Sequence, residues 1–140
     1  MRIKKTGGLF IFLFFTAQTL MAQLGSTETQ VISKFGDKYY KMGRSNLKEP
    51  YVIYQVKDSS ATSGHYTKFI GFYFKKYSDG MEYCNEQVIM EPISELNNWV
   101  EDYKNKYEEI GYRKYRDKTN KVLFKISQVD SLVKINIWYE

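Results

Sequence analysis

The side chains in this sequence that could support catalysis are few and lie far apart. His65 is the only histidine, Cys84 is the only cysteine, and Glu82 and Glu86 are carboxylates four residues apart on a predicted strand. Two carboxylates could carry out acid–base hydrolysis, and a cysteine beside a histidine could act as a nucleophile. A hairpin turn predicted at residues 78–80 would place Cys84 well short of His65. A small extracytoplasmic hydrolase using Glu82 and Glu86, or His65, is therefore an alternative hypothesis rather than the leading one.

Motifs for cofactors and metals are missing from the sequence. It has no Gly-rich phosphate loop, no Ser-x-x-Lys motif and no calcium-binding loop. One histidine and one cysteine cannot supply the ligand set of a structural zinc site. We therefore predict no catalytic residue, no cofactor and no metal.

Aromatic and basic side chains offer a better candidate for function. The chain has 13 tyrosines, and several have no place on the predicted inward faces. Tyr and Trp are favoured where one end of the ring meets an apolar surface and the other meets water, as in binding surfaces. The alternatives are that these rings cover the second face of the sheet, and that the basic cluster between residues 113 and 125 protects a strand edge. The predicted partner-binding residues are Tyr66, Tyr77, Tyr112, Tyr115, Trp138, Arg113 and Arg116.

The first 22 residues have the pattern of a secretory signal peptide. Basic residues at positions 2, 4 and 5 precede an apolar run of about a dozen residues, and Ala22 stands at the expected cleavage position. A spanning helix needs roughly 20 apolar residues, so we predict cleavage rather than a membrane anchor. The expected product, residues 23–140, is a single domain located in the periplasm or secreted.

Removing this leader changes the charge. The chain carries 21 basic and 16 acidic residues, and three of the basic ones lie within residues 1–22, so the remainder has a net charge of +2. Binding to nucleic acid through phosphates therefore loses its main support. The expected partner is instead a protein or polysaccharide of the cell envelope.

The elements that position these side chains follow from hydrophobic periodicity. Residues 92–111 have a helical stripe that runs from Ile93 to Ile110, with Pro92 and Gly111 at the expected ends. A short helix is expected at residues 28–36. Alternating patterns and turn signals predict strands at 51–57, 66–77, 81–90, 112–116, 121–127 and 132–140. The predicted fold class is α+β, an antiparallel sheet of five to six strands with two helices on one face, in the order α-β-β-β-α-β-β-β.

Three local features resemble known proteins. The leader ending in Ala22-Gln23, the short helix closed by Phe35-Gly36, and the strand Gly71-Phe72-Tyr73-Phe74 resemble small, largely uncharacterised secreted proteins of Bacteroidetes-type bacteria. The layout over residues 26–90 is also similar to outer-membrane assembly lipoproteins and β-lactamase-inhibitor-like modules. This chain differs in lacking a lipid-anchor cysteine and in having one helix in each half. The resemblance implies a layout and transfers no functional residue.

These patterns favour a non-catalytic, exported interaction module. It would bind an envelope or extracellular macromolecule through an aromatic-rich sheet surface. The alternatives are the hydrolase described above and a structural part of an envelope assembly, which Cys84 could join through an intermolecular disulfide.

Overall fold

The computed structural model describes residues 23–140, which form one antiparallel sheet of eight strands and two α-helices. The predicted leader, residues 1–22, lies outside the described residues. The predicted α+β class with an antiparallel sheet and two helices is confirmed. The predicted number of five to six strands is wrong, because two short edge strands were not expected.

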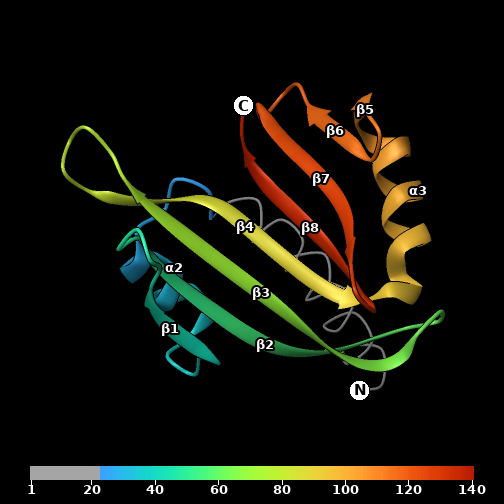
Figure 1. The fold of residues 1–140 in the computed structure, drawn as a ribbon, viewed down its shortest axis with the longest axis horizontal. Coiled ribbons are helices and arrows are strands. Elements are labelled where there is room, and N and C mark those ends of the chain that lie inside the picture. The colour runs from blue at the N-terminus through green and yellow to red at the C-terminus, as the bar shows by residue number, and fades with distance from the viewer. Residues whose placement is uncertain (1–22) are drawn as a thin grey trace, which may run out of the picture.

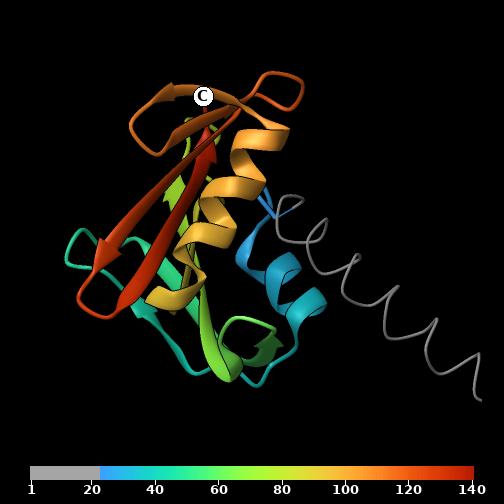
Figure 2. The same ribbon diagram turned by 90° about the vertical axis from the view of Figure 1, so that its right-hand side faces the viewer.

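Each of the two α-helices is followed by four strands. The elements are α2 (Glu28–Phe35), β1 (Lys41–Arg44), β2 (Pro50–Ser60), β3 (Gly64–Lys76), β4 (Glu82–Pro92), the 3-10 turn η1 (Ile93–Glu95), α3 (Leu96–Lys106), β5 (Glu108–Gly111), β6 (Lys114–Asp117), β7 (Val122–Val129) and β8 (Leu132–Tyr139). The sheet order is β1-β2-β3-β4-β8-β7-β6-β5, so two four-stranded meanders meet where β4 pairs with β8. Both helices lie on the same side of this sheet (Figure 1, Figure 2).

Helix α2 forms at the predicted place. Thr27 caps it, because its hydroxyl accepts a hydrogen bond from the backbone N–H of Gln30 and the Gln30 side chain accepts one in return. Gly36 follows the last turn with a positive φ of 94°, which favours glycine. Phe35 packs against Phe72 with ring centroids 4.8 Å apart. The helix thus covers the β1–β4 half of the sheet.

The helix predicted for residues 92–111 is shorter than expected. It consists of η1 and α3 and ends at Lys106, because Tyr107 adopts an extended conformation and Glu108 begins β5. Glu108 pairs directly with Arg116 of β6, and their side chains form an ion pair at 3.6 Å. Strand pairing therefore overrides the helical periodicity of the last turn, and Gly111 ends a strand instead of a helix.

The apolar stripe of α3 packs on the sheet, as predicted, and covers its β5–β8 half. Tyr103 is its centre, with ring centroids 4.8 Å from Phe124 and 5.7 Å from Tyr115. Tyr107 stacks on Phe124 at 4.6 Å. Such aromatic pairs add about 0.5–1.5 kcal/mol each beyond the burial of their area.

The strands alternate as predicted, with one exception in β4. The inward residues of β8, for example Val133 and Ile135, are fully buried. In β4 the sequence suggested one face for Cys84 and Val88, but Phe74 pairs with Cys84 while Tyr73 pairs with Glu86. The extra residue between them, Asn85, forms a β-bulge. The bulge turns Cys84 toward the core and Glu86 toward the opposite face.

The two unexpected strands are the edges of the sheet. β1 falls in residues 37–49, which were predicted to be irregular, and β5 falls at the end of the predicted helix. Each has only four residues. Short edge strands leave few unpaired backbone groups on which another chain could add a strand.

Candidate functional site

The face of the sheet opposite the helices, called the outer face below, carries side chains in rows that cross the strands. The first row contains Tyr51, Tyr73, Glu86, Trp138, Leu123 and Arg116. The second row contains Ile53, Gly71, Val88, Asn136, Lys125 and Lys114. The third row contains Gln55, Phe69, Met90, Lys134 and Ser127. No helix or strand within residues 23–140 covers these rows.

The β1–β3 part of the outer face is an aromatic platform. A Cβ placed on Gly71 would lie 2.9 Å from the Tyr73 ring, and one placed on Gly43 would lie 3.0 Å from the Tyr51 hydroxyl. Both tyrosines therefore lie across a glycine, a position that any larger residue would obstruct. Tyr51 and Tyr73 are neighbours, with ring centroids 6.0 Å apart. The result is a surface of ring faces close to the backbone, beside an apolar depression of about 190 Å³ that includes Phe69.

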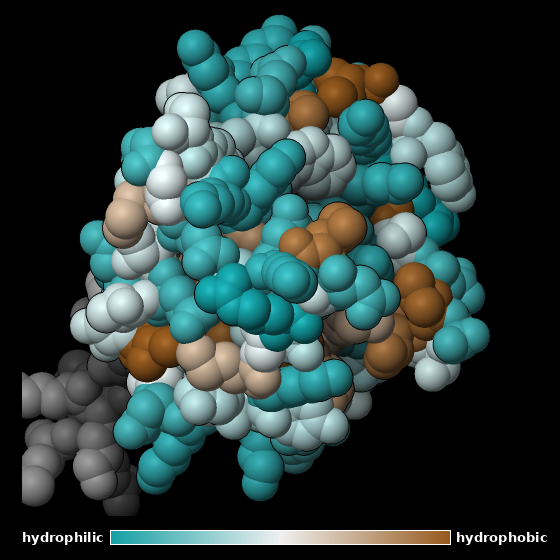
Figure 3. Space-filling model, turned by 60° about the vertical axis from the view of Figure 1, so that its left-hand side comes forward, coloured by the Kyte–Doolittle hydropathy of each residue, from teal (hydrophilic) through white to brown (hydrophobic). Residues whose placement is uncertain are grey.

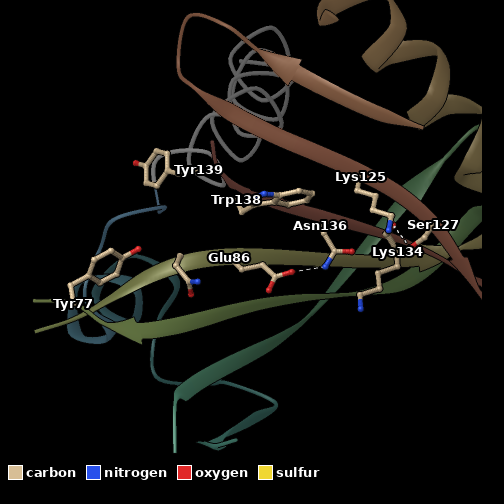
Figure 4. Close-up of a pocket in the computed structure, with 9 residues that line it drawn as sticks. Tyr77, Glu86, Lys125, Ser127, Lys134, Asn136, Trp138 and Tyr139 are labelled. Atoms are coloured by element: carbon tan, nitrogen blue, oxygen red, sulfur yellow. Dashed lines mark hydrogen bonds between the residues drawn. The ribbon is translucent and has the colours of Figure 1, made fainter. Parts of the chain in front are cut away.

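The β4, β8 and β7 part of the outer face forms an open hollow of about 640 Å³. It is lined by Tyr77, Asn85, Glu86, Lys125, Ser127, Lys134, Asn136, Trp138 and Tyr139. Figure 4 shows Glu86 and Asn136 pointing toward one another, with Trp138 beside them along β8. Figure 3, an oblique view of the molecule, shows mostly hydrophilic side chains and separated apolar patches. The visible surface is therefore unlike the continuous apolar centre of a permanent protein interface.

Three lysines crowd the hollow and its border. Lys114 and Lys125 stand directly opposite one another on β6 and β7. Lys125 faces Asn136 on β8, and Lys134 is two residues from Asn136 on the same strand. Like charges at facing positions destabilise a sheet. None of the three lysines forms an ion pair with any residue from 23 to 140.

A single carboxylate, that of Glu86, stands among these groups. Its Oε1 accepts a hydrogen bond of 2.6 Å from Asn136 Nδ2. Glu86 also lies near Tyr73, and burial followed by the charge of Glu86 raises the pKa of the Tyr73 hydroxyl. The ammonium of Lys114 lies 6.0 Å from the centroid of the Trp138 ring, within the range of a cation–π contact. The hollow thus combines a ring face, a carboxylate–amide pair and an excess of positive charge.

Two of the predicted partner-binding residues belong to the first row. They are Trp138 and Arg116, although Arg116 forms ion pairs with Glu108 and with Glu140, the latter at 2.8 Å. Tyr77 lies at one end of the hollow and is 45% exposed. The structure therefore brings Trp138, Tyr77 and Arg116 to the outer face.

The other four predicted residues lie elsewhere. Tyr115 is fully buried under α3, among the residues of the core. Tyr112 is 84% exposed in the β5–β6 turn, where Arg113 lies 5.0 Å from its ring centroid. Tyr66 points to the helix side of β3. The seven residues thus do not form one surface.

The catalytic candidates are not brought together. His65 pairs with Ser59 near the end of the β2–β3 hairpin, whereas Cys84 pairs with Phe74. The separation from His65 to Phe74 along β3 is about 30 Å at 3.3 Å per residue. Glu82 forms an ion pair at 3.3 Å with Arg44, and Glu86 is bound to Asn136. Neither carboxylate has the other as its partner.

A second polar cluster lies on the helix side, beneath α3. Glu91 is buried, accepts a hydrogen bond of 2.8 Å from Trp99 Nε1, and lies 3.9 Å from the ammonium of Lys68. Lys68 in turn contacts Asp58 at 2.7 Å. Burial, and then the charge of Glu91, raises the pKa of the Tyr66 hydroxyl in the same cluster. The cluster joins α3 to β2, β3 and β4. Holding these elements together is a sufficient structural role for its residues.

The sequence predicts only part of the hollow. The alternation in residues 132–140 correctly places Lys134, Asn136 and Trp138 outward. Their grouping with Glu86 depends on the bulge and on the β4–β8 pairing, which joins residues about fifty positions apart. No local pattern shows such a pairing.

Comparison with known proteins gives no further identification. No protein-family model, no curated protein and no solved structure matches this chain. Within residues 23–140, no group of three or more His, Cys, Asp or Glu side chains is arranged to hold a metal ion. In the same range, no helix has the length and apolar character needed to cross a membrane.

Proposed function

We propose that this chain is an exported, non-catalytic binding module that holds an anionic macromolecule of the cell envelope or its surroundings on the outer face. The observation that carries this proposal is the group of Lys114, Lys125 and Lys134 near Asn136, with Lys114 beside the Trp138 ring. Lys114 and Lys125 repel one another at facing positions, with Lys134 diagonal to Lys125, and an anionic ligand would remove that cost. The assignment to the cell exterior rests on the leader at residues 1–22.

The geometry favours binding across the face over binding at an edge. Partners that add a strand need a long unpaired edge, but β1 and β5 have only four residues each. The outer face, in contrast, spans eight strands, or about 34 Å at 4.8 Å per strand spacing. A chain-like ligand could contact several rows at once.

The alternatives have less support. A hydrolase using Glu82, Glu86 or His65 would need these groups at one substrate, and each has a separate environment. An assembly joined through Cys84 would need an accessible thiol, and Cys84 is fully buried. The three lysines and Trp138 on the outer face are the feature that neither alternative uses.

The proposal can be tested with protein recovered from a host that exports the full chain. Binding to immobilised polyanions and to neutral polymers would be measured at several salt concentrations. We expect retention on polyanions alone, weakening as salt rises, because exposed charges are screened. Failure to bind any polyanion at low salt would overturn the proposal.

Charge-matched variants locate the surface. The triple variant Lys114→Gln, Lys125→Gln, Lys134→Gln should lower affinity at least roughly tenfold, since one lost contact to a charged group is worth about 1.5–3 kcal/mol. The control carries Lys34→Gln, Lys104→Gln and Lys106→Gln, which remove the same charge from helices α2 and α3. Equal losses in both variants would show that net charge, and not the outer face, drives binding.

A further inference from the structure

We infer that the ligand is an acidic polysaccharide that lies across the strands along the first row, with sugar rings on Tyr73 and Trp138. This inference rests on the proposed function and names its ligand class. It follows from the spacing of the aromatic rings, from the groups between them and from the position of the lysines.

The spacing of the aromatic residues suits a repeating chain. Tyr73, Glu86 and Trp138 occupy the same row on the adjacent strands β3, β4 and β8. Two strand spacings, about 9.6 Å, therefore separate the backbone positions of Tyr73 and Trp138. This length is comparable to that of two linked sugar units. The apolar C–H faces of sugars pack on aromatic rings, and Tyr73 is held across Gly71 with its ring near the backbone.

The polar groups between the rings suit hydroxyl groups. Glu86 and Asn136 are joined at 2.6 Å, and together they offer carboxylate oxygens as acceptors and an amide as donor or acceptor. A pair of this kind can bind neighbouring hydroxyls of one sugar. A nucleic acid is a poorer match, because Glu86 would lie close to its phosphates.

The positive charge of the lysines is the reason to expect an acidic ligand. Lys125 and Lys134 flank Asn136, one on the neighbouring strand and one on the same strand, and Lys114 lies beside the Trp138 ring. They stand on one side of the first row, so carboxylate or sulfate groups on one edge of the glycan would meet them. An acidic peptide would also meet these lysines, but it would not use the ring faces in the same way.

The experiment compares polygalacturonate, polyglutamate and single-stranded DNA as probes, with neutral dextran as a blank. We expect polygalacturonate to bind most tightly. Trp138→Ala should weaken its binding roughly tenfold or more, and Trp138→Tyr should retain most of it, because a ring face remains. Binding of polyglutamate or DNA should be much less sensitive to Trp138→Ala.

Tryptophan fluorescence gives a second readout that does not depend on affinity. The chain has two tryptophans, Trp99 in helix α3 and Trp138 in the hollow. Addition of polygalacturonate should change the emission of the wild-type protein and of Trp99→Phe, but not that of Trp138→Tyr.

The outcomes separate the two proposals. If polyglutamate or DNA binds as tightly as polygalacturonate and Trp138→Ala has no effect, the glycan inference is wrong while the anionic binding module stands. If no polyanion binds, both are wrong. If polygalacturonate binding requires both Trp138 and the three lysines, both are supported.

Discussion

The indole Nε1 of Trp99 donates a hydrogen bond of 2.8 Å to the Glu91 carboxylate, and this contact joins helix α3 to strand β4. Burial raises the pKa of Glu91, although Trp99 and Lys68 act in the opposite direction. Four residues further along the chain, the pKa of Glu95 is lowered. Desolvation by burial opposes this shift, but hydrogen bonds from Ser60 and Asn98 outweigh it. Two neighbouring carboxylates therefore affect stability with opposite signs.

The first prediction concerns Glu91→Gln. A carboxylate whose pKa is raised by folding binds more protons in the folded than in the unfolded state, so its contribution to stability falls as pH rises above its ordinary value near 4.5. Glutamine does not titrate. The free energy of unfolding of the variant, relative to the wild type, should therefore increase between about pH 4.5 and 7. Urea denaturation at several pH values measures this difference.

Glu95→Gln is the matched control for this prediction. A lowered pKa means that the ionised group stabilises the fold above its ordinary pKa near 4.5, and that this stabilisation is lost as pH falls through the folded-state pKa. The variant should be less stable than the wild type at neutral pH, with a deficit that shrinks in acid. The same pH trend in both variants would contradict the assignment of opposite shifts.

The second prediction concerns the thiol of Cys84. Burial raises its pKa to about 12, and the side chain is fully buried. The reactive species is the thiolate, so the folded protein should not react with an aromatic disulfide reagent at neutral pH. One thiol per chain should react after guanidinium is added. Rapid labelling without denaturant, or a disulfide-linked dimer on non-reducing electrophoresis, would show that Cys84 is accessible.

The third prediction concerns Gly71→Ala. The new Cβ would lie 2.9 Å from a Tyr73 ring atom, so the ring must move away from the backbone. The obstructing atom belongs to a side chain that can rotate, so we expect a change in stability of less than about 1 kcal/mol. Ligand affinity should fall if the Tyr73 ring is a sugar platform. Gly111→Ala is the control, because its Cβ would meet only an ordinary contact at 3.8 Å.

The fourth prediction concerns the leader. If export removes residues 1–22, intact mass spectrometry of the exported protein should show a chain that begins at Gln23. Ala22→Pro should block cleavage and leave the longer chain with the membrane fraction. A product of full mass in the soluble fraction would contradict the predicted processing.

Secondary structure was predicted best where a hydrophobic pattern continues over many consecutive residues. The alternation in β7 and β8, the short helix α2 and the stripe of α3 were all predicted from neighbouring residues. The same reasoning missed β1 and β5, since four-residue edge strands contain too few residues to show a pattern.

The candidate site was harder to predict, because it depends on register between distant segments. The bulge at Asn85 reverses the face of every following β4 residue relative to Cys84, and no sequence signal marks it. It places Glu86 opposite Trp138 and leaves Cys84 in the core. Tyr115 has no place on the predicted inward faces, yet α3 and β7 enclose it.

The two ends of the described chain are joined by a contact that has a practical consequence. The Tyr139 hydroxyl donates a hydrogen bond of 2.9 Å to the carbonyl of Leu24, so the last strand lies beside the segment that precedes α2. A short linker could therefore close the chain into a ring, and a new opening could be placed in the Tyr77–Gly80 turn next to the hollow. Such a circular permutant would change the dynamics of the Tyr77 end of the hollow without altering any lysine or Trp138.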